Sequence, residues 1–311
     1  MASSTSTNAA GVISSLTGLK DFIDSIPESA TLYLDLEGNN LSRNGTITII
    51  TILVRPTEVT KLIDVQTLGS AAFTTPATGR KTLKAVLEDP LVSKCLWDVR
   101  NDADALWVHY KVRLAGVTDI QLLENASRYG DKTYVRGLHI CVEEDLKLEI
   151  LEFFRWSEIK RLFKTRMADD IFSRRPLDAV TKKYCINDVV YLPALQATYT
   201  KRMDSRWMKK VMDESARRVV EACSPDLNPQ PEKNMLKSWA LEAVESGMKS
   251  LELGKTPQRA PCQMFDVDAN DDYMTNKEKK EESYGYEMND FEAFDEELIN
   301  QLREAFDLPR K

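Results

Sequence analysis

Residues 33–38, with the sequence YLDLEG, place two carboxylates in a segment that otherwise has the pattern of a buried strand. Because side chains alternate between the two faces of a strand, Asp35 and Glu37 are expected on one face and the flanking leucines on the other. Carboxylates are rarely fully buried without a partner. Taken alone, the pair fits the solvated face of an edge strand, and the alternative is a site that binds positive charge.

The first half of the chain has the pattern of a mixed sheet. Three β-branched segments follow one another across turn-rich connections, which predicts an antiparallel meander. Strands and helices then alternate, which predicts parallel units. The expected strands are residues 31–37, 46–54, 61–65, 94–99 and 116–120, with helices at 13–26, 81–89, 102–110 and through most of 141–222. We therefore expect an α/β fold with a mixed five-stranded sheet flanked by helices.

The acidic charge is concentrated near the C-terminal end. The whole chain has a formal net charge of −7, but residues 261–311 alone contain 15 acidic and 6 basic residues. The first 260 residues are slightly basic, so a local patch there can meet a polyanion. The expected organisation is a disordered leader at 1–12, a domain at 13–222, a helical extension at 223–255 and a largely disordered acidic tail at 256–311.

The acidic tail ends in a short amphipathic pattern, with apolar residues at helical spacing between 290 and 306. A helix of this kind beyond a disordered linker is typical of segments that dock into a protein partner. The alternatives are that it folds back over a basic channel or covers an apolar surface of its own domain.

The composition excludes several classes of protein. No apolar run reaches the ~18 residues of a membrane span, and the N-terminal residues have no secretory or transit pattern. The five cysteines are scattered and only two histidines are present, which argues against a disulfide framework and a zinc site. We expect an intracellular protein of the cytoplasm or nucleus that binds no membrane.

Asp102 and Asp188 lie where they could join Asp35 and Glu37 in a site that binds positive charge. Asp102 follows the strand at 94–99, and ligands of open α/β sheets bind beyond the carboxyl ends of parallel strands. Tyr184 and Asp188 are four residues apart on a predicted helix, so they share one face. The simpler alternatives are an acid in the first turn of a helix for Asp102 and a Tyr–Asp pair at a domain surface.

Four acids gathered at one sheet edge would repel one another and would be costly to bury. Two divalent cations offset four negative charges, and carboxylate oxygens favour Mg²⁺ or Mn²⁺. Two such ions stabilise the attacking and leaving oxygens of an in-line phosphoryl displacement. The acids therefore indicate phosphodiester chemistry.

Three motifs in order extend this interpretation. The sequences LYLDLEG at 32–38, LWDVRNDADAL at 96–106 and YCINDVVYL at 184–192 resemble the three motifs of the DEDDy branch of the DnaQ-like 3′–5′ exonucleases. This group of the ribonuclease H-like superfamily contains ribonuclease D and the Werner-type exonuclease. The preceding RRPLDAVTKKY resembles the ribonuclease D subgroup, and within the superfamily the chain is similar to the Egalitarian-like group. The resemblance covers roughly residues 13–222.

The resemblance implies a role for each acid. Asp35, Glu37 and Asp188 would ligate the metal that activates water, and Asp35 and Asp102 would hold the second metal beside the leaving 3′ oxygen. Tyr184 would orient the attacking water or help to deprotonate it. The implied reaction removes nucleoside 5′-monophosphates from the 3′ end of a single strand or 3′ overhang.

Substrate contacts are less sharply indicated. Residues 155–183 contain nine basic and four acidic residues, a composition suited to phosphate binding or to a solvated helix face. The expected nucleic-acid contacts are Leu36 through its backbone, Asn101, Arg174, Arg175 and Lys182. The residues do not separate RNA from DNA, although the ribonuclease D-like third motif favours RNA slightly. The alternative function is a scaffold that binds nucleic acid and has lost catalysis.

Overall fold

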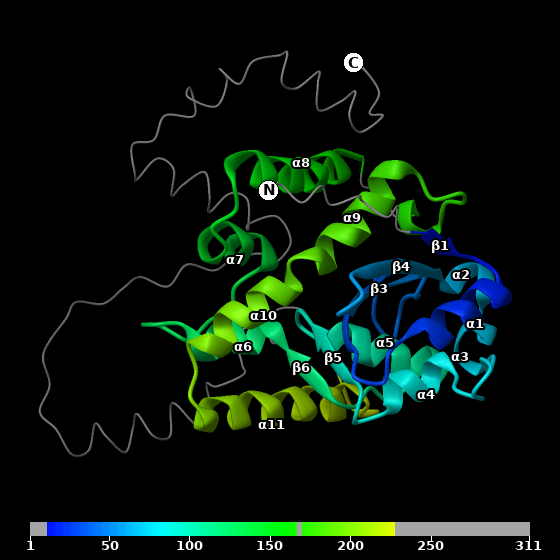
Figure 1. The fold of residues 1–311 in the computed structure, drawn as a ribbon, viewed down its shortest axis with the longest axis horizontal. Helices are drawn as coiled ribbons and strands as arrows, with labels where there is room; N and C mark the ends of the chain where they lie inside the picture. The colour runs from blue at the N-terminus through cyan, green and yellow to red at the C-terminus, as the bar shows by residue number, and fades with distance from the viewer. Residues whose placement is uncertain (1–10, 167–169, 228–311) are drawn as a thin grey trace, which may run out of the picture. The chain divides into compact units, whose positions relative to one another are not determined.

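The computed structural model describes residues 11–166 and 170–227 (Figure 1). The expectations for residues 1–10, for most of the helical extension and for the acidic tail with its helix at 290–306 lie outside the described residues. Within the described part, no helix is both long and apolar enough to span a membrane.

The sheet is mixed and has six strands, in the order β1-β4-β3-β2-β5-β6. An antiparallel meander is formed by β2 (Thr31–Glu37), β3 (Ile49–Arg55) and β4 (Val59–Asp64). The strands β5 (Ser93–Leu96) and β6 (Val117–Asp119) extend it in parallel from β2. The α/β fold and the predicted meander are confirmed.

The sixth strand was not predicted. The short strand β1 (Gly11–Ile13) pairs in parallel with β4, so the sheet gains an edge strand and the ordered fold begins before residue 13. Gly11 and Val12 were expected in a disordered leader, because a segment of three residues is too short to show a strand period. Their pairing depends on β4, which lies about 50 residues further along the chain.

Helices from the first half of the chain cover one face of the sheet, as Figure 1 shows. They are α1 (Leu16–Ser25), α2 (Val65–Leu68), α3 (Ala71–Thr74), α4 (Leu83–Glu88) and α5 (Arg100–Tyr110). Their apolar side chains form one core with Leu32, Leu34 and Leu36 of β2.

The second core lies on the opposite face of the sheet and includes Tyr33 of β2. The helical elements after β6 are α6 (Ile120–Ser127), α7 (Leu138–Asp145), α8 (Ile150–Arg166), η1 (Ile171–Ser173), α9 (Ala179–Val190), α10 (Leu192–Lys201) and α11 (Ser205–Ala222). The last helix contributes Val211 to this core and Val219 to the first one, so it lies at the β6 edge of the sheet.

The alternation of β2 determines where the site forms. Leu34 and Leu36 face the first core, whereas Tyr33 faces the second. Asp35 and Glu37 therefore point to the face that carries α9, as the period of two predicts. This face brings the first motif and the third motif together.

Candidate active site

Three acids from two distant motifs meet at the end of β2. Asp35, Glu37 and Asp188 each offer a carboxylate oxygen, and these atoms lie within 4.8 Å of one another. The two residues of β2 share a strand face, and Asp188 projects from α9, which packs against β2. The Oδ2 atom of Asp35 is buried and has no hydrogen-bond partner. A buried carboxylate oxygen without a donor is suited to a cation.

Asp102 reaches the same place from the second motif. It lies in the first turn of α5, and its Oδ1 accepts a hydrogen bond of 3.1 Å from the amide of Leu36. Since Leu36 stands between Asp35 and Glu37, this bond ties α5 to the acidic pair. Asp102 is therefore next to the three-acid group without being one of its members.

Crowded negative charge raises the pKa of these acids. Burial raises the pKa of Asp35 and of Glu37 well above the ordinary range, and the charges of Asp188 and Asp102 raise both further. Burial and, after it, the charge of Asp98 raise the pKa of Asp102 to about 8. Groups with such pKa values are typical of functional sites. The all-carboxylate donor set fits hard divalent cations, which would relieve this repulsion.

A lysine that was not predicted as a site residue also lies at the acids. The Nζ of Lys160 on α8 makes an ion pair with Oδ1 of Asp188. It also lies 5.2 Å from the ring centroids of Trp156 and Tyr184. The sequence shows Lys160 only as one member of a basic segment, because nothing local indicates which lysine faces the site.

Helix α8 is held against α9 by a reciprocal pair of hydrogen bonds. Trp156 Nε1 donates to the carbonyl of Asn187 at 3.0 Å, and Asn187 Nδ2 donates to the carbonyl of Trp156 at 2.9 Å. Asn187 precedes Asp188, so this contact fixes the position of Lys160 along α9 relative to the Asp188 carboxylate. Trp156 is buried and belongs to the second core.

Tyr184 lies one helical turn before Asp188 on α9. Its ring stacks on Phe163 with centroids 3.8 Å apart and an interplanar angle of 21°. The charge of Asp188 and then burial raise the pKa of the phenol above its usual value. The hydroxyl therefore stays protonated at neutral pH and can donate a hydrogen bond.

Comparison with known proteins agrees with this geometry. A model of the 3′–5′ exonuclease family matches residues 11–220. The chain belongs to this family. No curated protein matches the sequence of this exonuclease.

Solved structures share the exonuclease's fold at low identity. Ribonuclease D of Trypanosoma brucei in complex with RNA U12 has a TM-score of 0.60 and 19% identity, over 76% of this chain and 78% of that chain. The same enzyme in complex with GMP has a TM-score of 0.58 and 19% identity, over 71% and 68%. The catalytic core of RRP6 from Trypanosoma brucei has a TM-score of 0.52 and 14% identity, over 69% and 53%. At these identities the likeness shows the fold, and the family match shows that the chain is a 3′–5′ exonuclease.

The residues expected to contact the substrate lie in different environments in the exonuclease structure. The Leu36 side chain is buried in the core and its amide donates to Asp102, and a backbone contact of Leu36 with the terminal nucleotide stays a prediction. Asn101 is exposed at the start of α5, and Lys182 is half-buried on α9. Arg174 is exposed and pairs with Asp170 at 2.7 Å. A role in binding nucleic acid stays a prediction for Asn101, Lys182 and Arg174.

Arg175 has internal partners instead. Its Nε and Nη2 donate to the two carboxylate oxygens of Asp64 at 2.8 and 2.7 Å. Further bonds go to the carbonyls of Thr48 at 3.2 Å and Phe172 at 2.8 Å. This bidentate ion pair with a buried carboxylate anchors the segment before α9 to the sheet. This structural role replaces the expected phosphate contact.

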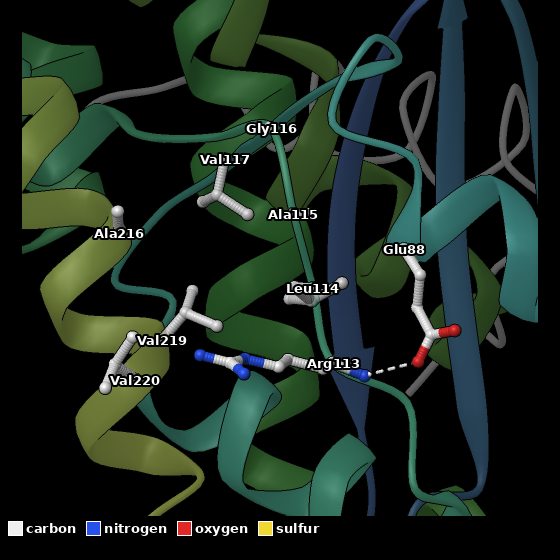
Figure 2. Close-up of a pocket in the computed structure, with 9 residues that line it drawn as sticks. All are labelled: Glu88, Arg113, Leu114, Ala115, Gly116, Val117, Ala216, Val219 and Val220. Carbon is white, nitrogen blue, oxygen red and sulfur yellow. Dashed lines mark hydrogen bonds between the residues drawn. The ribbon is translucent and has the colours of Figure 1, made fainter.

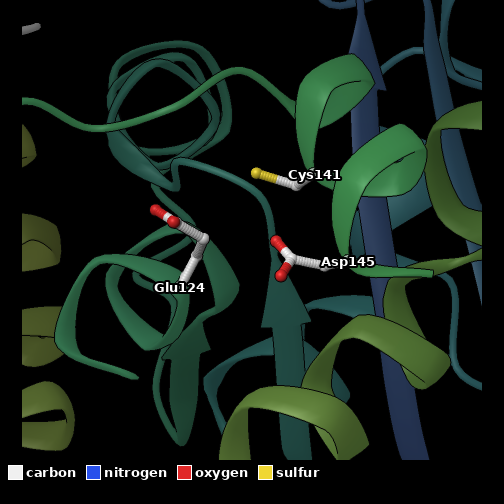
Figure 3. Close-up of side chains that lie close together, drawn as sticks. All are labelled: Glu124, Cys141 and Asp145. Carbon is white, nitrogen blue, oxygen red and sulfur yellow. The ribbon is translucent and has the colours of Figure 1, made fainter. Parts of the chain in front are cut away.

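A second cluster of possible ligands lies away from the acids of the site. The side chains of Glu124, Cys141 and Asp145 point toward one another in Figure 3, with ligand atoms within 4.8 Å. Glu124 is already bound by Arg128 at 2.7 Å, and Asp145 accepts from Arg202 at 2.8 Å. Burial raises the pKa of the Cys141 thiol to about 12. We interpret this cluster as a neutralised structural network, because metal ligands must be deprotonated and free of competing cations.

Figure 2 shows a groove at the other end of the parallel strands. It is lined by Glu88 at the end of α4, by the residues around Gly116 that lead into β6, and by Val219 and neighbours on α11. The amide of Arg113 donates to Glu88 Oε1 at 3.0 Å there. Ligands of such sheets bind at the carboxyl ends of the strands, so this groove at the amino end of β6 is not the active site.

Proposed function

We propose that this exonuclease uses two divalent cations, Mg²⁺ or Mn²⁺, to hydrolyse single-stranded RNA from its 3′ end and release nucleoside 5′-monophosphates. The observation that carries the proposal is the meeting of Asp35, Glu37 and Asp188 within 4.8 Å, with Asp102 joined to them through the Leu36 amide. Four carboxylates that repel one another have a clear use as ligands for two dications.

Each side chain has a defined task in this proposal. Asp35, Glu37 and Asp188 would hold one cation, and Asp35 and Asp102 would hold the other. When bound, the cations would lower the pKa of water and neutralise charge on the leaving 3′ oxygen. Tyr184 keeps its proton and orients the attacking water by a hydrogen bond, because its pKa is raised.

RNA is favoured over DNA as the substrate on two grounds. The sequence of the third motif resembles the ribonuclease D subgroup, and ribonuclease D of Trypanosoma brucei, which shares the fold, has been solved in complex with RNA. The presence of all four acids and of Tyr184 counts against the alternative of a scaffold without catalysis, since a decayed site would be expected to lose some of them.

The decisive experiment follows the products of the full chain on matched RNA and DNA oligonucleotides labelled at the 5′ end. We expect ladders that shorten from the 3′ end and release nucleoside 5′-monophosphates, with Mg²⁺ or Mn²⁺ and not with EDTA. Asp35→Ala should lower the rate by about 10³-fold or more, because cations supply several kcal/mol of transition-state stabilisation. Asp213→Ala, at an exposed ion pair on α11, is the matched control and should be as active as the wild type.

Activity that survives EDTA or Asp35→Ala contradicts the metal-dependent mechanism. Equal rates on RNA and DNA contradict the substrate assignment alone. A folded protein that binds both oligonucleotides and degrades neither supports the scaffold.

A further inference from the structure

Asp119, at the end of β6, is saturated with hydrogen bonds and fully buried. Its carboxylate accepts from the amides of Asp98 at 3.0 Å, Val99 at 3.1 Å and Gln121 at 3.0 Å, and from Arg218 Nη1 at 2.6 Å. Two of these amides belong to the residues that lead into α5. Asp119 therefore holds the backbone of the second motif by hydrogen bonds at the point where strand gives way to helix.

The residues that Asp119 holds lie immediately before helix α5. Helix α5 begins after Val99, which gives it no side-chain cap. Asp98 just before it has a φ of 61°, a left-handed conformation that residues other than glycine adopt rarely. The carboxylate of Asp119 accepts from the amides on both sides of this turn, so it stabilises the conformation that sets the direction of α5.

The first turn of α5 carries Asp102 to the acidic pair. Asp102 follows Val99 by three residues, and its Oδ1 accepts from the Leu36 amide at 3.1 Å. A shift at the start of α5 therefore moves this carboxylate relative to Asp35 and Glu37. Only a few backbone residues separate Asp102 from the amides that Asp119 holds.

Arg218 of α11 neutralises Asp119. Its guanidinium is only 2% exposed and also lies 3.3 Å from Gln121 Oε1 and 3.5 Å from Asp98 Oδ1. The same helix supplies Ser215, whose Oγ accepts from the Asp119 amide at 3.0 Å. Helix α11 packs along β6 and α5 in Figure 1, so its last turns support both the end of β6 and the start of α5.

We propose that Arg218 and Asp119 are positioning residues for Asp102, so that α11 is a working part of the active site and not only a cover on the sheet. The inference rests on the proposed role of Asp102 as a metal ligand. Partners that orient metal ligands typically change metal affinity or activity by 10- to 100-fold when they are lost.

The experiment compares full-length Arg218→Gln and Arg218→Lys with Arg217→Gln, all on the same helix. Arg217 is half-exposed and pairs with Glu214 and Glu221 at the surface, so its substitution is the control. Three quantities are measured on protein that is folded by circular dichroism. They are the affinity for Mn²⁺ by calorimetry without substrate, kcat and KM on single-stranded RNA, and the Mg²⁺ concentration that gives half of the maximal rate.

For Arg218→Gln we expect the affinity for Mn²⁺ to be at least about 10-fold weaker and kcat to be lower by a similar factor, with an unchanged KM. The Mg²⁺ concentration that gives half of the maximal rate should rise, and high Mg²⁺ should restore part of the rate. Arg218→Lys should recover part of the loss, because its ammonium keeps the charge beside Asp119. If Arg218→Gln does not fold, Arg218→Lys and Ser215→Ala decide the question by the same measurements.

The inference and the proposed function fail in different ways. Asp102→Asn with normal activity rejects the role of Asp102 and with it the proposed mechanism. Inactive Asp102→Asn together with Arg218 variants that bind Mn²⁺ and turn over RNA like the wild type, even with lower thermal stability, rejects the positioning role alone.

Discussion

Asp102→Asn should stabilise the metal-free protein while it abolishes activity. Burial, with the charge of Asp98, raises the pKa of this carboxyl from 3.8 to about 8, so at pH 7 the folded protein holds it mostly protonated. Uptake of that proton costs about 1.4 kcal/mol for each pH unit above the pKa of the unfolded chain. The cost is about 4 kcal/mol at pH 7 and about 2 kcal/mol at pH 5. Asparagine is neutral, keeps an oxygen for the Leu36 amide and avoids this cost.

The sign of the pH dependence follows from the direction of the shift. A carboxyl whose pKa is raised in the folded state destabilises the fold progressively as the pH rises from about 4 to about 8. The advantage of Asp102→Asn should therefore grow over this interval and then level off. For a domain of this size, the increase in Tm is about 10 °C at pH 7 and about half as much at pH 5.

Thermal and urea unfolding in EDTA at pH 5 and pH 7 measure this effect. Asp104→Asn is the matched control two residues further along α5. Asp104 is also buried but pairs with Arg43 at 2.8 Å, so its substitution should destabilise the protein by about 3 kcal/mol at either pH. A gain for Asp102→Asn that is absent, or that is equal at pH 5 and pH 7, would refute the electrostatic reasoning.

Four further predictions concern the basic residues and the tail. Arg175→Gln should lower the free energy of unfolding by about 3 kcal/mol in urea, because it leaves a buried carboxylate unpaired. Arg174→Gln should leave unfolding unchanged but weaken RNA binding and reduce its salt dependence by about one counterion, and equal salt slopes would contradict this. Lys160→Gln should lower stability in EDTA by about 2 kcal/mol, since Asp188 loses its cation. Deletion of residues 256–311 should raise the rate if the tail folds back, and an unchanged rate argues against it.

The acids of the site show what the local sequence pattern can predict. Asp35 and Glu37 are two residues apart on a strand, and Tyr184 and Asp188 are four apart on a helix, so the period of each element predicts the shared face of each pair. The structure confirms both faces and brings the two pairs to one place. The same reasoning predicted the meander and the parallel units, because strand and helix periods and turn residues are local properties.

Contacts between distant segments were the part that the residues did not reveal. The pairing of β1 with β4, the ion pair of Lys160 with Asp188 and the internal partners of Arg175 all join positions far apart in the chain. A basic residue has the same local signature whether it faces phosphate, a buried carboxylate or solvent. The expectation for Arg175 therefore differs from its observed environment.

The sequence alone determined the fold class, the order of most elements and the acids of the site, because these depend on periodicity and on motifs within short segments. Only the tertiary structure decided how the acids are held. The Leu36 amide donates a hydrogen bond to Asp102, and α11 is linked to the residues just before α5 through Arg218 and Asp119. The physical reason is that the position of a buried carboxylate depends on which donors surround it, and those donors come from segments that only folding brings together.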